Sequence, residues 1–285
     1  MTLAITQALN GLTFGALLFL VASGFTLIFG LMRIVNLAHG ALYLMGGYIA
    51  LSVASKSASF ALAIGAAAAG IAAVGFVIDR FLLGFVKGYE LRQVLLTLGI
   101  ALFMNDLALV IWGGDTFTVP IPEALRGAAS FAGVTYPRYR IFVLGVGIVV
   151  FILLWLLVNR TRLGALIRAG VDDAETVEAI GIDIKRVFVA TFMLGAALAG
   201  VGGALGGAFL SLYPTADSEI LVFSLAVVVI GGRGSLWGAV VGSLFVAMLA
   251  TYGQVWFPEL AYFVIFGPMA LLLAFRPLGL FGRAA

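Results

Sequence analysis

The residues that could do chemistry in this chain are few, and most of them sit inside long apolar stretches. Asn36, His39, Asn105, Asp106 and Gln254 are polar side chains within such stretches. A charged group at mid-membrane costs roughly 2.5–3.5 kcal/mol on insertion scales, so Asp106 must face protein or water. A proton relay is one interpretation, but no intramembrane basic partner or second carboxylate accompanies Asp106. We favour a hydrogen-bonded structural carboxylate, or one exposed to an aqueous vestibule.

A second group of ionisable side chains lies in the loop 160–186, between two apolar runs. Its acidic cluster is Asp172, Asp173, Glu175 and Glu178, and its basic flanks are Arg160, Arg162, Arg168, Lys185 and Arg186. Either of the two aspartates can cap a helix, and Glu175 follows Asp172 by three residues in a capping-box-like arrangement. Gly181 can end that helix.

The pattern predicts a two-turn amphipathic helix held in water between two membrane spans. Its short apolar face would consist of Ala174, Val177, Ala179 and Ile180. Such a helix cannot bury this face alone, which favours docking on another protein. The alternative is a solvated loop that carries only the charge bias of its side of the membrane.

Two glycine-containing segments share the form basic, glycine, small, leucine, aromatic: His39–Tyr43 and Arg233–Trp237. Paired glycine-interrupted segments point to duplicated broken helices around a substrate path, although Tyr43 and Trp237 are explained equally well as interfacial anchors. The hinge or broken-helix candidates are Gly40, Gly231, Gly232 and Gly234. The candidates for lining a path are Asn36, His39, Tyr43, Asn105 and Asp106.

The composition identifies the environment that must position these residues. Of 285 residues, 63% are hydrophobic and 10% are charged, whereas soluble domains run about 45–50% apolar and about 25% charged. The mean hydropathy is +1.19. A soluble enzyme, a disordered chain and a disulfide scaffold are therefore excluded, since cysteine is also absent. One histidine makes a protein-only metal site improbable, and a net charge of +3 gives no indication of nucleic acid.

The charge-free runs predict an all-α, polytopic membrane bundle of about eight or nine transmembrane segments. About 20 apolar residues cross the hydrocarbon layer as a helix. The runs cover 1–32, 34–55, 57–78, 141–159, 187–216 and 234–258, with near-misses at 93–114, 220–232 and 260–275. Residues 220–232 are short for a crossing and could form a re-entrant or broken helix. Spanning strands are excluded because the runs do not alternate.

The basic residues predict the orientation. Loops 79–92 and 160–186 are separated by two spans, so they lie on one side of the membrane. With that side in the cytoplasm, twelve basic residues face inward: Arg33, Arg80, Lys87, Arg92, Arg160, Arg162, Arg168, Lys185, Arg186, Arg233, Arg276 and Arg283. Four face outward: Lys56, Arg126, Arg138 and Arg140. The positive-inside rule then places the amino terminus outside and the carboxyl terminus inside.

Three segments in order resemble the permease subunits of branched-chain amino acid ABC importers. They are Gly11–Ala50 with its Asn36–Gly40 stretch, then Thr161–Ala169 followed by Glu178–Ile182, and finally Ile230–Gly242. The resemblance covers most of the chain. It implies a single permease domain over 1–285 in a bacterial inner membrane, a second homologous permease, two cytoplasmic ATPase subunits and a periplasmic solute-binding protein.

The resemblance also gives the helix at 172–181 a role, since it would sit in a groove of one ATPase and transmit nucleotide-driven closure. The expected contact residues are Asp172, Asp173, Ala174, Glu175, Thr176, Glu178, Ala179 and Gly181. ATP and magnesium would bind the partner ATPases, and this chain would bind no cofactor. Gly231–Ser235 lacks the lysine of a phosphate-binding loop. The chain also lacks the longer glutamate-alanine-alanine loop, ending in proline, of other ABC permeases.

Two alternative functions, the solute and the make-up of the permease pair stay open at this point. A secondary transporter or channel without ATPases is disfavoured, because Asp106 and His39 are the only intramembrane candidates for proton coupling. An integral membrane enzyme lacks clustered catalytic residues. Within the resembled class the solute could be leucine, isoleucine or valine, urea or a short amide, or an aromatic carboxylate. Two different permeases are favoured over two copies of this chain.

Overall fold

The computed structural model describes residues 2–32, 35–57, 59–86, 88–131, 134–232 and 234–282. Its helices are α1 (Thr2–Met32), α2 (His39–Ser57), α3 (Phe60–Val77), α4 (Glu90–Trp112), α5 (Arg138–Arg160), α6 (Arg162–Asp172), α7 (Ala174–Ala179), α8 (Ile184–Phe209), α9 (Ala216–Gly231), α10 (Leu236–Trp256) and α11 (Ala261–Phe275). A π-turn, η1 (Ile78–Leu82), and a 3-10 turn, η2 (Leu83–Val86), extend α3. Two more 3-10 turns are η3 (Glu123–Leu125) and η4 (Pro258–Leu260).

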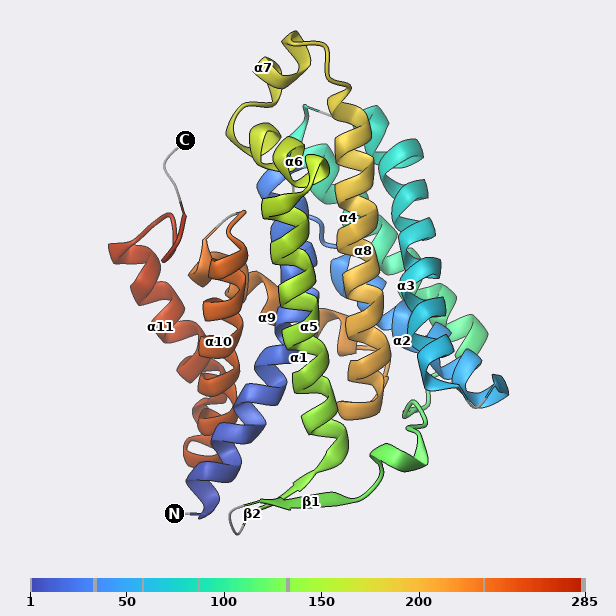
Figure 1. Ribbon diagram of the computed structural model, residues 1–285, viewed down its shortest axis with the longest axis vertical. Coiled ribbons are helices and arrows are strands. Elements are labelled where there is room, and N and C mark those ends of the chain that lie inside the picture. The colour runs from blue at the N-terminus through green and yellow to red at the C-terminus, as the bar shows by residue number, and fades with distance from the viewer. Residues whose placement is uncertain are drawn as a thin grey trace.

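The long helices confirm an all-α membrane fold. Six described helices are long and apolar enough to cross a bilayer: α1, α3 with its extension, α4, α5, α8 and α10. The less apolar α2 and the shorter α9 and α11 complete the bundle (Figure 1). The eight or nine segments predicted from the charge-free runs thus correspond to these six spanning candidates together with α2, α9 and α11. Strands occur, among the described residues, only as a short hairpin outside the bundle.

α1 is the centre of the bundle. Its most apolar 18-residue stretch is 89% buried, against 17% for α5 on the outside. α8 is the second interior helix and packs against α1, α2 and α3. The lipid tails are as apolar as the side chains, so burial of apolar area does not hold such helices together; close backbone packing has to do so.

Glycine supplies that close packing between α1, α2 and α8. Gly24 of α1 faces Gly195 of α8 so closely that a Cβ on either would overlap the other's carbonyl. On α2, Gly46 lies against the backbone of Gly200. Gly203 lies against the carbonyl of Tyr43. Small residues therefore set the distance between these three helices.

The chain is broken between α1 and α2, and α2 begins inside the bundle. His39, its first residue, is fully buried, and its Nε2 lies 2.9 Å from the carbonyl oxygen of Val21. Val21 precedes the end of α1 at Met32 by eleven residues, which is about 16 Å of helix. The run 34–55 is therefore not a full-length crossing. The first turn of α2 lies deep in the bundle, and only the rest of the helix continues to the far side.

The two loops predicted to share one side of the membrane lie at the same end of the bundle. The amino terminus and the hairpin lie at one end, while α6, α7 and the carboxyl terminus lie at the other (Figure 1). Loops 79–92 and 160–186 share the second end. Four of the basic residues used to predict orientation, Arg33, Lys87, Arg233 and Arg283, lie outside the described residues.

The loop 114–140 contains an unpredicted β-hairpin. Strands β1 (Ala128–Phe131) and β2 (Val134–Pro137) pair antiparallel, with Ala129 opposite Tyr136. The Tyr136 hydroxyl lies 2.9 Å from Thr13 Oγ1, which ties the hairpin to α1. The prolines and small residues of this segment favour a loop over a strand, and a tertiary contact overrides that weak preference.

The glycine packing predicts a stability difference between two matched substitutions. Gly203→Val should destabilise the isolated chain by about 1–3 kcal/mol or more, because the new side chain meets backbone that cannot move aside. Gly145→Val, in the exposed face of α5 with open space around it, makes the same chemical change without the overlap. Thermal unfolding in detergent measures both. Equal midpoints for the two variants would contradict the packing account.

Candidate functional site

The polar loop between α5 and α8 folds into two short helices at the end of the bundle. Thr161 begins α6 by accepting a hydrogen bond from the backbone N–H of Gly164 at 3.1 Å. Asp173 begins α7 in the same way, since its Oδ1 accepts from the N–H groups of Glu175 and Thr176, both at 3.1 Å. Each side chain satisfies amides that a helix start leaves unpaired. The prediction of a capped helix at this position is therefore confirmed.

The structure corrects one of the two caps considered. Asp172 is the last residue of α6, so the capping-box arrangement of Asp172 with Glu175 does not form. Asp173 lies between the helices in an extended conformation, with φ −155° and ψ 97°. An N-cap needs this non-helical backbone, and the end of α6 leaves only Asp173 free to adopt it.

Gly181 ends α7, as predicted. Its φ of +88° is one that side-chain-bearing residues rarely adopt. The reversal lets the N–H of Ile182 donate to the carbonyl of Val177 at 3.3 Å. The chain then passes directly to Asp183, which caps α8 through the N–H groups of Lys185 and Arg186.

The apolar face of α7 is partly buried against the rest of the chain and partly exposed. Val177 is 4% exposed and packs in a cluster with Leu31, Ile167, Ile184 and Val187. Ile180 is 69% exposed. Seven residues of the predicted contact set, to which Ile180 does not belong, are exposed: Asp172, Asp173, Glu175, Thr176, Glu178, Ala179 and Gly181. The side chain of the eighth, Ala174, lies outside the described residues.

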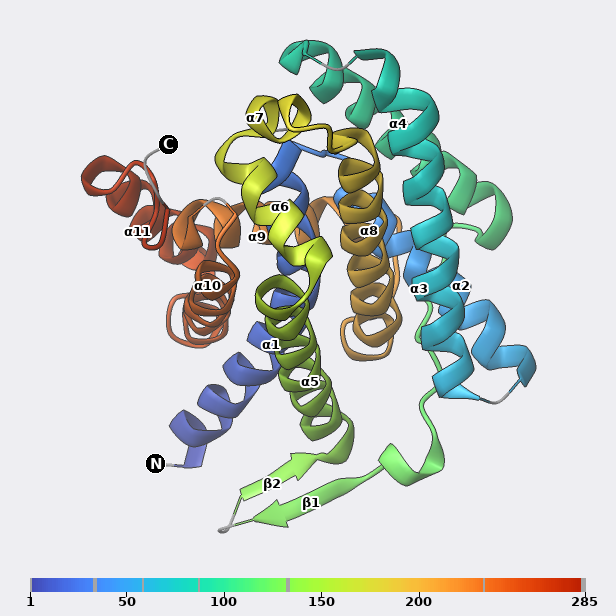
Figure 2. The ribbon, with the colours of Figure 1, turned by 45° about the horizontal axis from the view of Figure 1, so that its top comes forward.

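α7 is thus an acidic projection held to the bundle through Val177. Figure 2, in which this end of the molecule comes forward, shows it above α6 and beside the start of α8. Val177 fixes it to the ends of α1, α6 and α8, so movement of α7 would act directly on helices that cross the bundle.

Three of the five path candidates are sealed in the interior. Asn36 is fully buried, and its Oδ1 accepts a hydrogen bond from the N–H of Ala38 at 3.1 Å, directly before α2 begins. His39 packs its ring against Phe25, with centroids 5.2 Å apart. Tyr43 fills the space above Gly202 and Gly206 of α8, where a Cβ would meet its ring or hydroxyl. These side chains hold the broken helix in place.

Asn105 contacts a carboxylate that the sequence analysis did not single out. Its Nδ2 donates to Asp217 Oδ2 at 2.8 Å, and Asp217 is 5% exposed. Gly40, the second residue of α2, lies against the backbone carbonyl of Asp217. The first turns of α2 and α9 therefore meet inside the bundle, with Asn105 of α4 beside them.

Asp217 was missed because it ends the charge-free run 187–216 and was counted as a boundary. A signal was available: Pro214, followed by Asp217 and Glu219, is the pattern of a helix start with acidic residues in its first turn. A helix that starts there extends only to Gly231, or 16 residues. This is shorter than the roughly 20 residues of a full crossing, in keeping with the broken or re-entrant alternative.

Asp106 is exposed on the outer face of α4. It makes no hydrogen bond or ion pair with the part of the chain that the structure describes. Its neighbours along that helix are exposed apolar side chains, including Leu102 at 58%, Phe103 at 66% and Val110 at 83%. The interpretation of Asp106 as a carboxylate hydrogen-bonded within this chain is wrong, and the exposed alternative stands.

The hinge candidates Gly231, Gly232 and Gly234 lie at the junction of α9 and α10. Gly231 ends α9 against the backbone of Gly238, and Gly232 and Gly234 have φ of +97° and +70°. Gly234 lies beside Gly30, near the end of α1, whereas His39 lies beside Val21. The two glycine motifs therefore stand at different depths, and a duplicated pair at one level is not formed. Arg233 lies outside the described residues.

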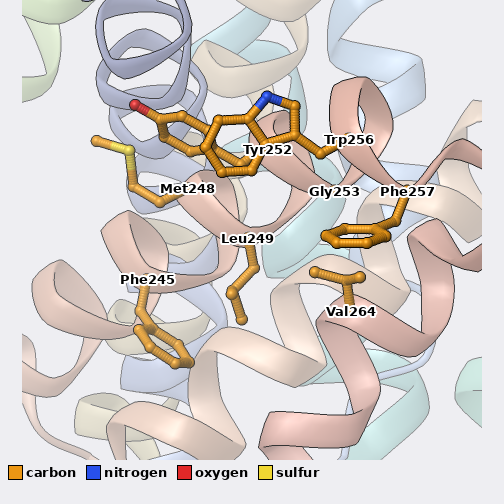
Figure 3. A pocket seen from close by; sticks show the side chains of 8 residues that line it. All are labelled: Phe245, Met248, Leu249, Tyr252, Gly253, Trp256, Phe257 and Val264. Carbon is orange, nitrogen blue, oxygen red and sulfur yellow. The ribbon is translucent and has the colours of Figure 1, made fainter. Parts of the chain in front are cut away.

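A separate cavity of about 300 Å³ lies between α10 and α11 (Figure 3). Its lining is Phe245, Met248, Leu249, Tyr252, Gly253, Trp256, Phe257 and Val264. The Tyr252 hydroxyl is already donated to the carbonyl of Ala4 at 2.9 Å. A polar or charged solute would find little to bind there, so we assign this cavity no part in a solute path.

Comparison with known proteins agrees with this architecture. The chain matches the family described as branched-chain amino acid transport system / permease component over residues 7–273. It is 31% identical to the high-affinity branched-chain amino acid transport system permease protein BraD of Pseudomonas aeruginosa, over 97% of this chain and 95% of the relative. Identity to the corresponding permease LivH of Escherichia coli is 27%, with the same coverage.

A more distant relative transports a different solute. The ribose import permease RbsC of Escherichia coli is 26% identical over 81% of this chain and 72% of its own length. No solved structure matches the chain. The family match and the near-complete coverage by BraD are decisive: the chain is a member of the branched-chain amino acid ABC transporter permease family.

Proposed function

We propose that this chain is the membrane-spanning subunit of an importer for branched-chain amino acids, driven by ATPases that dock on α7. The observation that carries this proposal is the seating of α7, which is fixed by Val177 to the ends of three other helices while its acidic face stays exposed. The solute class is taken from the names of BraD and LivH. In the proposed complex a second permease and a periplasmic solute-binding protein complete the path and deliver the solute.

The orientation follows from charge. The end that carries α6 and α7 also carries most of the basic residues, so the positive-inside rule places it in the cytoplasm of a bacterial inner membrane. The amino terminus and the hairpin then face outward. In this arrangement α7 meets the compartment that holds ATP, which an ATPase-driven mechanism requires.

The proposed coupling between an ATPase and the membrane helices depends on the residues that α7 contacts. ATP-driven closure can bias the membrane helices only if their two states hold α7 differently. The cluster of Val177 with Leu31 and Ile184 joins α7 to α1 and α8, the two interior helices of the bundle. A displacement of α7 by a bound ATPase would therefore be transmitted to the helices around the start of α2.

The outer face of α4 is the proposed boundary of the solute path. Asp106 there would cost roughly 2.5–3.5 kcal/mol if it faced lipid, so protein or water must cover it. A second permease packed along α4 would cover Asp106 with protein or enclose water beside it, with Asp106 turned toward the path between the two subunits and the Asn105–Asp217 pair on the interior side of α4. This arrangement requires no chemistry from the permease itself, since ATP and magnesium would be bound by the partner ATPases.

An ATPase-independent carrier is the alternative. The family places this chain among the permease components of multi-component transport systems, which favours the ATPase-driven function. Purification under mild conditions distinguishes the two, because an importer permease brings ATPase subunits with it.

The first prediction concerns the acidic face of α7. Glu175→Lys combined with Glu178→Lys should abolish most solute-stimulated ATP turnover by the reconstituted complex, because two exposed contacts reverse their charge. The control is Glu123→Lys, an exposed residue of η3 at the opposite end of the bundle. Unchanged stimulated turnover in the double variant would exclude α7 as the coupling element.

The second prediction concerns Asp106. Asp106→Leu should lower uptake by the complex about tenfold or more while leaving thermal unfolding of the isolated chain unchanged, because the carboxylate makes no hydrogen bond or ion pair among the described residues. Asp115→Leu, in the loop after α4, is the matched control and should retain uptake. If Asp106→Leu transports as fast as the wild type, the outer face of α4 does not border the path.

A further inference from the structure

A second hollow lies away from the path, at the end of the bundle that carries α7. It has a volume of about 760 Å³ and is formed by η1, η2 and the first turns of α8. Its lining is Phe76, Asp79, Arg80, Gly84, Phe85, Asp183, Lys185, Arg186, Val189, Ala190 and Met193. None of these residues belongs to the set expected to contact an ATPase.

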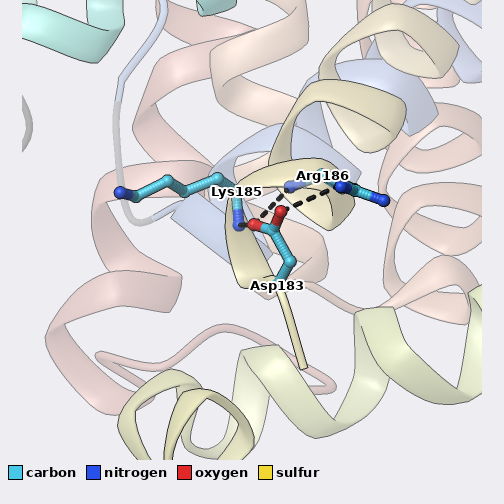
Figure 4. A network of polar contacts seen from close by, with 3 residues as sticks. All are labelled: Asp183, Lys185 and Arg186. Carbon is cyan, nitrogen blue, oxygen red and sulfur yellow. Dashed lines mark hydrogen bonds and ion pairs between the residues drawn. The ribbon is translucent and has the colours of Figure 1, made fainter. Parts of the chain in front are cut away.

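Four of the five charged residues that line this hollow are exposed and form its outer rim. Asp183 forms an ion pair with Arg186 at 2.9 Å and also caps α8, so it is fully engaged (Figure 4). In Figure 4 the Lys185 side chain extends away from that pair. Arg80 is likewise exposed, whereas Asp79 is 1% exposed. The rim therefore presents two cations, Arg80 and Lys185, that Asp183 does not neutralise.

The lining becomes apolar with depth along two helices. On α8, Lys185 is followed by Val189 and then Met193, eight residues or about 12 Å deeper. On the facing helix, Arg80 follows Phe76, which is 39% exposed, and Phe85 of η2 is 85% exposed. A ligand that fits this gradient has an anionic end and a hydrocarbon end.

We propose that this hollow binds an anionic phospholipid, with the phosphate between Arg80 and Lys185 and an acyl chain along Val189, Met193 and Phe76. The location supports a lipid because both helices cross the membrane and their charged ends lie where headgroups lie. Basic pockets between helix ends on the cytoplasmic side are suited to anionic headgroups. The side assignment rests on the proposed orientation, but the binding itself does not depend on transport.

The local backbone fits a ligand-binding role. The wall of the hollow contains a π-turn followed immediately by a 3-10 turn, η1 and η2. π-Turns inside helices are uncommon and occur frequently at functional sites. Here the π-turn carries the two charged residues of this wall, Asp79 and Arg80, between the apolar Phe76 and Phe85.

The test measures lipid binding to the purified, delipidated full-length chain. Native mass spectrometry with added dioleoyl phosphatidylglycerol should show at least tenfold tighter binding than with dioleoyl phosphatidylcholine. Each cation near an anionic lipid strengthens binding about fivefold, so Arg80→Gln with Lys185→Gln should weaken phosphatidylglycerol binding roughly twenty-five-fold. Glycerol 3-phosphate, which has no acyl chain, should bind far more weakly than the lipid.

The matched control removes two other exposed cations at the same end, Arg160→Gln with Arg168→Gln, and should keep the preference for phosphatidylglycerol. Because all four residues are exposed, both double variants should unfold at the wild-type temperature. The proposal is overturned if both lose the preference equally, or if the wild type binds both lipids alike. It is also overturned if glycerol 3-phosphate binds as tightly as the lipid, or if the Arg80/Lys185 variant loses ATPase association while its lipid binding is unchanged.

Discussion

Close backbone packing at glycine is the constraint on which the rest of this structure depends. In a bilayer, apolar side chains gain little by contacting one another instead of lipid, so helix contacts must come from close approach. Gly24 with Gly195 and Gly46 with Gly200 bring α1, α2 and α8 together at backbone distance. That approach leaves room for the chain to re-enter the bundle after α1 and to begin α2 beside Val21. Two interior polar residues stabilise this break: Asn36 accepts a hydrogen bond from the amide of Ala38, and His39 contacts the carbonyl of Val21 in the middle of α1.

The same packing links the two functional regions. α1 carries Val21 at the start of α2 and Leu31 in the cluster that seats α7. α8 begins directly below α7 and passes Tyr43 further along. In the proposed importer, a force applied to α7 would reach the first turns of α2 and α9 through two helices that share glycine contacts, without a long chain of flexible side chains.

Much of the fold could be predicted from the sequence, because each long helix coincides with a run that carries almost no charge. The short helix near residue 175 and its end at Gly181 were also predictable, since capping depends on local residues. Depth within the membrane was not predictable. Whether a run such as 34–55 starts at the surface or halfway down depends on a contact between His39 and Val21, which no local pattern contains. Asp217 was overlooked for the same reason: a carboxylate at the edge of an apolar run looks like a surface residue until Asn105 and Gly40 are placed beside it. The choice of Asp173 over Asp172 depended on where α6 ends.

The sidedness of α7 tests the account most directly. The chain contains no cysteine, so Glu178→Cys and Ser130→Cys each introduce a single labelling site, on α7 and on the hairpin at the opposite end. With a membrane-impermeant maleimide, Cys at 130 should react in spheroplasts with intact inner membranes, and Cys at 178 should react only after those membranes are opened. Reaction of position 178 in intact spheroplasts would place α7 outside the cell and contradict its proposed role as the contact for a cytoplasmic ATPase.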